Sequence, residues 1–150
     1  MANTYTSLHY HVVVSTNNGQ PFLIEPIRER LFAYLGGIAR ENGMNALELG
    51  GVADHVHLLL SIPASLAVSK AVQVIKGGSS HWVKETFLNM IDFAWQDGYA
   101  AFTVSQSQLD NVQSYIRSQP EHHRNKAFAE EYRAFLARHR IEYDERYLLG

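Results

Sequence analysis

Cysteine is absent from this chain of 150 residues. Without thiols the protein can form neither disulfides nor thiolate zinc sites, and no cysteine can serve as a nucleophile. We therefore expect a protein of the reducing cytoplasm. The polar residues 1–7 lack the basic and apolar regions of a signal peptide. No apolar run approaches the ~20 residues of a membrane span, so we expect neither feature.

A basic excess is also missing. The 13 Lys and Arg residues face 15 Asp and Glu, which leaves a formal net charge of -2 at pH 7, whereas nucleic-acid-binding domains are usually basic. This balance argues mildly against a generic nucleic-acid binder but is compatible with a local basic patch. Hydrophobic residues make up 46% of the chain, which is typical of a globular protein. The length predicts a single domain over residues 1–150.

Histidine is abundant, with eight residues, and two of them form the first candidate site. His55 and His57 flank Val56 in an apolar run, residues 54–60, bounded by glycines before it and a proline after it. This pattern predicts a buried strand. Side chains two apart on a strand share a face, here roughly 7 Å apart along it. Two imidazoles so placed can bind one divalent metal.

The rest of the chain predicts an α+β fold. Turn residues and hydrophobic periodicity predict strands over 5–15, 46–52, 94–96 and 99–104, and helices over 26–42, 65–76, 82–87, 107–119 and 126–138. Residues 77–80 interrupt the second helix, and Asp97-Gly98 is a strong hairpin signal. His9 and His11 share a strand face, which we interpret as sheet surface. The order indicates an antiparallel sheet with helices packed on it, ferredoxin-like, with helices added at the C-terminal end.

The predicted helix 107–119 holds a second candidate pair. Tyr115 and Gln119 are four residues apart, so they lie on one side of the helix. A tyrosine hydroxyl, with a pKa near 10, is a poor nucleophile alone, but beside a metal-bound phosphodiester it can attack phosphorus. The glutamine oxygen can complete a His-His-Gln set that suits Mg²⁺ or Mn²⁺. The alternative is a packing tyrosine and a glutamine at a helix C-cap that points elsewhere, since Pro120 disfavours helical geometry before it.

With these motifs the chain resembles the single-tyrosine transposases of the HUH endonuclease superfamily, found in insertion sequences and as REP-associated relatives. His55-Val56-His57 matches the HUH pattern, and Tyr115 to Gln119 matches the Tyr-x-x-x-Gln helix. The resemblance covers nearly the whole chain in the right order. Further matching segments are Tyr10-His11, Lys76 to Ser80, Trp95 to Tyr99, Glu121 to His123 and Glu142 to Tyr147.

The resemblance implies a metal-dependent enzyme with the HUH endonuclease fold that cuts and rejoins single-stranded DNA at element ends marked by imperfect hairpins. The tyrosine attacks the scissile phosphate, giving a 5′-phosphotyrosine and a free 3′-OH, and rejoining is the reverse reaction. By position, Tyr115 is the nucleophile, and His55, His57 and Gln119 are the metal ligands. Family members are typically homodimers in which the tyrosine helix of one subunit can complete the site of the other.

Four basic residues are candidates for DNA contacts. Lys76 precedes Gly77-Gly78 and can place a charge on a phosphate, while Arg117, Arg124 and Lys126 surround the tyrosine helix and can form a local basic patch. For each of them a solvated surface charge is the alternative.

Two other functions compete with the transposase. One is a hairpin-binding relative that has lost strand transfer. The other is a metal-dependent phosphoesterase acting on a small molecule, in which Tyr115 merely packs.

Overall fold

The computed structural model describes residues 3–124 and 126–148, and in them a single antiparallel sheet has the strand order β2-β3-β1-β4. Its four strands are β1 (His9–Ser15), β2 (Asn45–Val52), β3 (His55–Ser61) and β4 (Ala100–Val104). This order, with one helix in each crossover, is the ferredoxin-like βαββαβ arrangement. The predicted α+β fold class is therefore confirmed.

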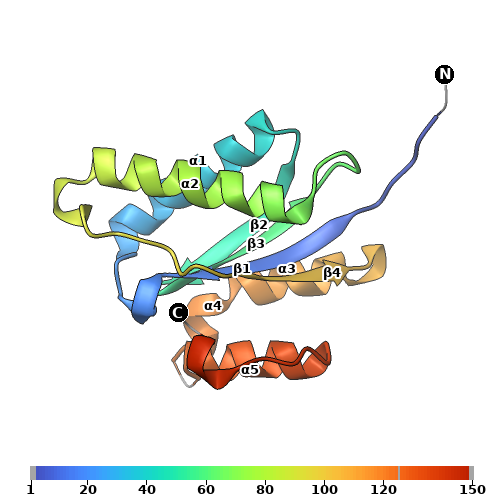
Figure 1. Cartoon of the computed structure of the whole chain (residues 1–150). Helices are drawn as coiled ribbons and strands as arrows, with labels where there is room; N and C mark the ends of the chain where they lie inside the picture. The colour runs from blue at the N-terminus through green and yellow to red at the C-terminus, as the bar shows by residue number, and fades with distance from the viewer. Residues whose placement is uncertain (1–2, 125, 149–150) are drawn as a thin grey trace.

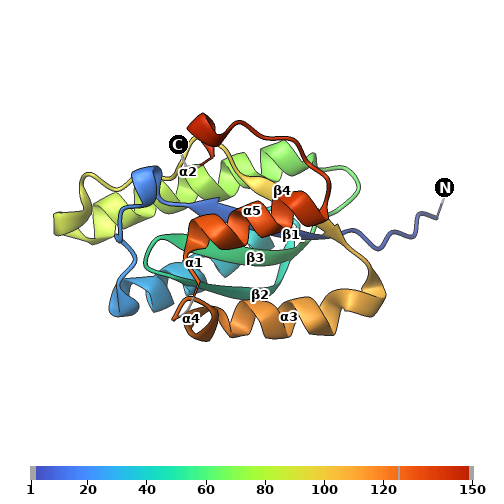
Figure 2. The same ribbon diagram turned by 90° about the horizontal axis from the view of Figure 1, so that it is seen from below.

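Helices cover both faces of the sheet (Figure 1). The crossover helices α1 (Glu25–Glu41) and α2 (Val68–Thr86) lie on one face. On the other lie α3 (Leu109–Arg117), α4 (Gln119–His122) and α5 (Phe128–Arg138) (Figure 2). Short 3-10 turns span Asn17–Gly19, Leu88–Met90, Gln106–Gln108 and Glu145–Tyr147. Within the described ranges no helix is both long and apolar enough to cross a membrane.

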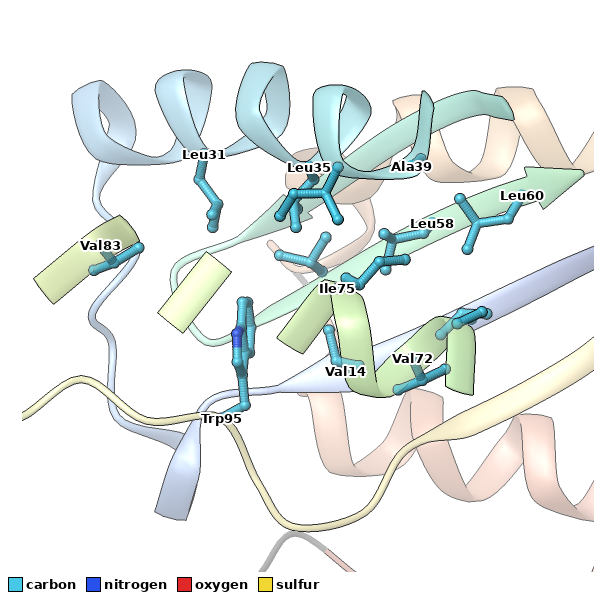
Figure 3. Packing of buried hydrophobic residues seen from close by; sticks show 14 of the residues in the cluster. Val14, Leu31, Leu35, Ala39, Leu58, Leu60, Val72, Ile75, Val83 and Trp95 are labelled. Atoms are coloured by element: carbon cyan, nitrogen blue, oxygen red, sulfur yellow. The ribbon is translucent and has the colours of Figure 1, made fainter. Parts of the chain in front are cut away.

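The main core lies between the sheet and the α1–α2 layer. Leu58 and Leu60 of β3 point into it beside Leu35 of α1 and Ile75 of α2 (Figure 3). Because successive side chains of a strand alternate between faces, His55 and His57 must face the opposite layer, where α3 to α5 lie. The alternation of one strand thus separates the hydrophobic core from the candidate site.

Helix α3 lies directly against the backbone of β2. A Cβ atom added at Gly50 would stand 2.3 Å from the carbonyl oxygen of Ile116 and 2.8 Å from its Cγ2. Only a residue without a side chain permits this approach. Since Ile116 follows Tyr115 directly, the close contact sets the position of the tyrosine over the sheet.

The predicted interruption of the second helix is wrong, because α2 runs unbroken through residues 77–80. Its small residues serve packing instead. A Cβ at Gly78 would lie 3.1 Å from Cδ1 of Ile38 on α1. Ser79 Oγ donates a 2.6 Å hydrogen bond to the carbonyl of Ile75 and accepts one of 3.0 Å from Trp95 Nε1. The run lets two helices and a tryptophan approach closely.

The predicted hairpin around Asp97-Gly98 is also wrong. Trp95 forms an isolated bridge with Thr16, at the end of β1, and not with β4. The turn that follows is held by the ammonium group of Lys76, which donates to the carbonyls of Gln96, Asp97 and Gly98 at 2.5, 3.1 and 3.0 Å. The carbonyl groups of this turn therefore accept hydrogen bonds from a lysine of α2 and not from the backbone of a second strand.

Several predicted boundaries also differ from the structure. Strand β1 begins at His9 instead of residue 5. Helix α3 ends at Arg117, and Pro120 lies in the first turn of the separate helix α4, a position that tolerates proline because its missing N–H is not needed there. Tyr115 and Gln119 consequently belong to two helices, not one.

Candidate metal and tyrosine site

The two histidines of β3 meet a carboxylate from α5. His55 and His57 are fully buried, with ring centroids 5.1 Å apart. Their Nε2 atoms lie 3.3 and 3.1 Å from Oε1 of Glu131. The strand therefore aims both imidazoles at one point, as its alternation predicted, and the third group comes from 74 residues further along the chain.

Glu131 was missed in the sequence, although one signal was present. Phe128, Tyr132 and Phe135 form the buried stripe of α5 at the i, i+4, i+7 spacing of an apolar helix face. Glu131 lies within that stripe and is 3% exposed. Acidic residues are almost never fully buried unless they are paired, so a carboxylate on this face indicates a partner across the interface.

These three residues fit a divalent metal. One ligand atom from each of His55, His57 and Glu131 lies within 4.8 Å of the others. Nδ1 of His55 lies 2.7 Å from Oδ1 of Asp54, so an Nδ1–H can donate to the carboxylate, and this orientation would direct an Nε2 lone pair at an ion bound in the cluster. Imidazole and carboxylate are ordinary ligands of Mn²⁺ and related divalent ions. The donor set and its orientation both suit such an ion.

Gln119 joins this cluster even though Pro120 follows it. Its side chain is fully buried, its Oε1 lies 3.0 Å from Nε2 of His55, and its Nε2 donates to Glu131 Oε2 at 3.0 Å. The amide oxygen therefore faces the histidine nitrogens. The Gln119 side chain therefore does not point away from the site. The chain turns at the start of α4, and this turn directs the glutamine toward the histidines.

Tyr115 contacts the same carboxylate. Its hydroxyl donates a hydrogen bond to Oε2 of Glu131, and its ring lies 5.9 Å from the ring of His57. Burial, together with the hydrogen bond to Glu131 and its negative charge, raises the pKa of the Tyr115 hydroxyl above its usual value. In this arrangement the tyrosine stays protonated at neutral pH. The tyrosine and the histidines that it lies beside belong to the same chain.

The charges of the cluster are set by burial and by the carboxylate. Burial opposes ionisation of Glu131, but hydrogen bonds from His123, His55 and His57 outweigh it and hold the pKa of the carboxyl well below its usual range. Burial lowers the pKa of His57 to about 4. For His55, burial also opposes the charge, yet hydrogen bonds to Asp54, Glu131 and Gln119 raise its pKa. The site therefore holds a permanent negative charge beside a neutral His57.

His11 is not sheet surface, contrary to the sequence interpretation. It is 3% exposed, and its Nε2 lies 2.7 Å from Nδ1 of His57. Burial, with the neighbouring His57, lowers the pKa of His11 to about 3. The interpretation failed because β1 lies between β3 and β4 in the sheet, so the face that carries His11 is the one that α5 covers.

The four predicted basic residues lie in different places. Lys76 is on α2, across the sheet from the cluster, and binds the turn carbonyls. Arg117 Nη2 pairs with Oε1 of Glu48 at 2.9 Å. Arg124 and Lys126 line a hollow of about 430 Å³ that Asp54 and His123 also border. His123 Nε2 in turn lies 3.2 Å from Glu131 Oε1, so of these four basic residues only Arg124 and Lys126 border a hollow that reaches the His55, His57 and Glu131 cluster.

Comparisons with known proteins identify the family of the chain. The profile of the family described as "Transposase IS200 like" matches residues 4–119. The chain is 28% identical over 117 residues to the ISDra2 transposase TnpA of Deinococcus radiodurans, covering 75% of this chain and 84% of that protein. It is 28% identical over 127 residues to the transposase for insertion sequence element IS200 of Salmonella typhimurium, covering 81% and 82%.

Two solved structures are similar as well. A putative transposase from Deinococcus radiodurans R1 superposes with a TM-score of 0.66 at 25% identity, over 77% of this chain and 94% of that one. A REP-associated tyrosine transposase bound to a REP hairpin has a TM-score of 0.60 at 15% identity, over 82% and 74%; at that identity the likeness concerns the fold.

The family match includes His55, His57, Tyr115 and Gln119 and ends before α5. Glu131 is therefore contributed by a helix beyond the matched span. The buried histidine pair, the tyrosine beside it and a match over most of the chain lead to one conclusion: this protein belongs to the IS200-like transposase family.

Proposed function

We propose that this protein nicks and rejoins single-stranded DNA by transesterification on the hydroxyl of Tyr115. The observation that carries the proposal is the double contact of Glu131, whose Oε2 accepts the tyrosine hydrogen bond while its Oε1 lies among the histidine nitrogens. Nucleophile and metal ligands thus meet at one carboxylate. A tyrosine nucleophile must lie beside the metal ligands, whereas a small-molecule phosphoesterase would not require a tyrosine at this carboxylate.

A divalent ion, Mg²⁺ or Mn²⁺, would be held by His55, His57, Glu131 and the oxygen of Gln119. When bound, the ion supplies Lewis-acid polarisation of the phosphate oxygens. Asp54 keeps the Nε2 lone pair of His55 directed at the ion. The ligand set extends the predicted His-His-Gln set by one carboxylate, which adds a negative charge and makes the site more selective for divalent cations.

In the proposed reaction Tyr115 Oη attacks the scissile phosphorus. An O–P bond to the tyrosine forms as the P–O3′ bond breaks, so the strand on one side becomes a 5′-phosphotyrosine. The other strand leaves as a 3′-OH that gains the proton the tyrosine has lost. Rejoining reverses these changes, so the cycle consumes neither water nor ATP. The single strand would reach the site along the hollow where Arg124 and Lys126 can pair with its phosphates.

An adduct assay tests this proposal. Purified protein is mixed with end-labelled single strands from the DNA that flanks its gene, including any imperfect hairpins, with Mn²⁺ or EDTA, and run on a denaturing gel. We expect a labelled band at protein mass that needs metal and disappears in Tyr115→Phe. Hairpin binding in a gel shift without an adduct, on strands that span the element ends, would instead favour the relative without strand transfer.

The homodimer implied by the family resemblance stays a proposal, and whether its subunits share sites has its own test. Mixing Tyr115→Phe with His57→Ala restores adduct formation only if a tyrosine from one chain can serve the histidines of another. Because the two residues already meet within one chain, we expect little restoration unless subunits exchange their α3 helices.

A further inference from the structure

A second hollow lies on the α3–α5 side of the sheet and shares no lining residue with the one at Arg124 and Lys126. Its volume is about 370 Å³, within the range of small-ligand sites. Phe102 of β4, Val112 of α3 and Phe135 of α5 form its walls, and His11 of β1 is part of its lining. The hollow is therefore bordered by β1, which pairs with the strand of His57, and by α3, which carries Tyr115.

The hollow combines aromatic groups with positive charge. The rings of Phe102 and Phe135 stack at 5.5 Å, and the exposed imidazole of His139 stacks on Phe102 at 4.4 Å. The guanidinium of Arg138 lies 5.5 Å from the centroid of Phe135. A base can extend such a column by stacking on its exposed end, and a guanidinium beside it can bind the attached phosphate.

A buried nitrogen also reaches this hollow. His11 Nε2 contacts His57, whereas no hydrogen-bond partner of His11 Nδ1 is found within residues 3–124 and 126–148. No fully enclosed side-chain nitrogen or oxygen in that part of the chain lacks a partner, so Nδ1 of His11 is not fully enclosed, and His11 lines this hollow. Because His11 is 3% exposed and lines this hollow, we infer that its Nδ1 faces this space.

The histidine pair links the hollow to the metal ligands. If His57 binds an ion through Nε2, its Nδ1 carries the hydrogen and donates to Nε2 of His11. His11 then carries its own hydrogen on Nδ1 and offers an N–H donor to the hollow. A base carbonyl or ring nitrogen is an acceptor that fits this donor.

We propose that the hollow holds one nucleotide of single-stranded DNA next to the scissile phosphate, with its base against His11 and His139 and its phosphate at Arg138. The position follows from Tyr115, whose ring lies 6.3 Å from that of His11 and 5.5 Å from that of Phe135. This proposal rests on the proposed function. It assigns to α5, which lies beyond the family match, a part in choosing the nucleotide at the cleavage site.

Nuclear magnetic resonance on the full chain tests the pocket. Protein labelled with ¹⁵N-histidine, in Mg²⁺, is titrated with each of the four deoxynucleoside 5′-monophosphates. We expect the imidazole signals of His11 and His139 to shift, with one base favoured, and Arg138→Gln to weaken binding at least about threefold, as for a lost charge-assisted hydrogen bond. The matched control is Arg133→Gln, which removes an exposed guanidinium of the same helix that pairs with Glu145.

Unchanged His11 and His139 signals at ~10 mM nucleotide, well above the 1 mM level of a weak contact, would overturn the proposal. So would equal loss of binding in the Arg138 and Arg133 variants. The adduct assay separates the nucleotide-pocket proposal from the proposed strand transfer by Tyr115. An adduct without nucleotide binding refutes the pocket alone, whereas nucleotide binding at His11 without any adduct supports the pocket and refutes the strand transfer.

Discussion

Replacing Gly50 with alanine tests whether the packing of α3 on β2 positions Tyr115, the proposed nucleophile. The new Cβ would stand 2.3 Å from the carbonyl oxygen of Ile116, whereas carbon and oxygen atoms in ordinary contact lie at about 3.4 Å or more. The obstacle is backbone, which cannot rotate aside as a side chain can. Helix α3 must therefore move away from the sheet by about 1 Å.

Two effects of known size follow from this displacement. Overpacking of this kind costs about 1–3 kcal/mol, and the restricted unfolded chain returns about 0.4–1 kcal/mol, so we expect the free energy of unfolding to fall by about 1–2 kcal/mol. Tyr115 immediately precedes Ile116 in the displaced helix. A misplacement of ~1 Å at a reacting group can slow a reaction about 10²-fold, so the rate of adduct formation should fall far more than the stability.

The matched control is Gly77→Ala. A Cβ there meets nothing within 4 Å, and the position lies inside α2, so alanine should stabilise the protein by about 0.5–1 kcal/mol. Urea unfolding measures the first effect and the adduct assay at matched folded fraction measures the second. A Gly50→Ala protein with wild-type stability and wild-type adduct rate would refute the close packing of α3 on β2.

Three further predictions concern the proposed metal site, Lys76 and pH. Asp54→Asn should weaken Mn²⁺ binding about 10–100-fold in calorimetry, because an outer carboxylate that orients a ligand histidine contributes that much; unchanged affinity would contradict the role of His55. Lys76→Met should lower the free energy of unfolding by about 1 kcal/mol, because the hydrogen bonds to the turn carbonyls are lost. If Lys76 served only to bind phosphate, the substitution would leave the urea midpoint unchanged. Folding lowers the pKa values of His11 and His57 from 6.5 to about 3 and about 4. Between the folded and unfolded pKa values these histidines therefore bind protons only in the unfolded protein. The metal-free protein should therefore lose stability as the pH falls from 6.5 toward 4, by up to about 1.4 kcal/mol per pH unit for each histidine, and a flat profile of urea midpoints would contradict their burial as neutral groups.

The order of elements and the orientation of the histidine strand could be predicted because they depend on neighbours in sequence. A period of two places His55 and His57 on one face whatever the rest of the fold does. The same local logic predicted helices over 26–42 and 126–138 and strands over 46–52 and 54–60, which the structure contains as α1, α5, β2 and β3.

The errors have a common cause in contacts between distant segments. Residues 77–80 have the composition of a helix break, but Ile38 and Trp95 pack against them and the helix continues. Asp97-Gly98 has the composition of a hairpin turn, but Trp95 pairs with Thr16 instead of with a residue of β4. In both places a neighbour from another layer outweighs the local preference, as tertiary context does for propensities of only a few tenths to one kcal/mol per residue.

The amino-acid sequence was sufficient for the fold class, the histidine pair, the tyrosine and the family resemblance, since these follow from local spacing and from motifs of adjacent residues. It was not sufficient for Glu131 and His11, whose roles depend on which surface α5 covers. Glu131 acquires its low pKa from hydrogen bonds to His123 and to histidines that are far away in the sequence, whereas His11 acquires its low pKa because packing removes its imidazole from water. That desolvation is a property of the assembled layers and not of any segment within them.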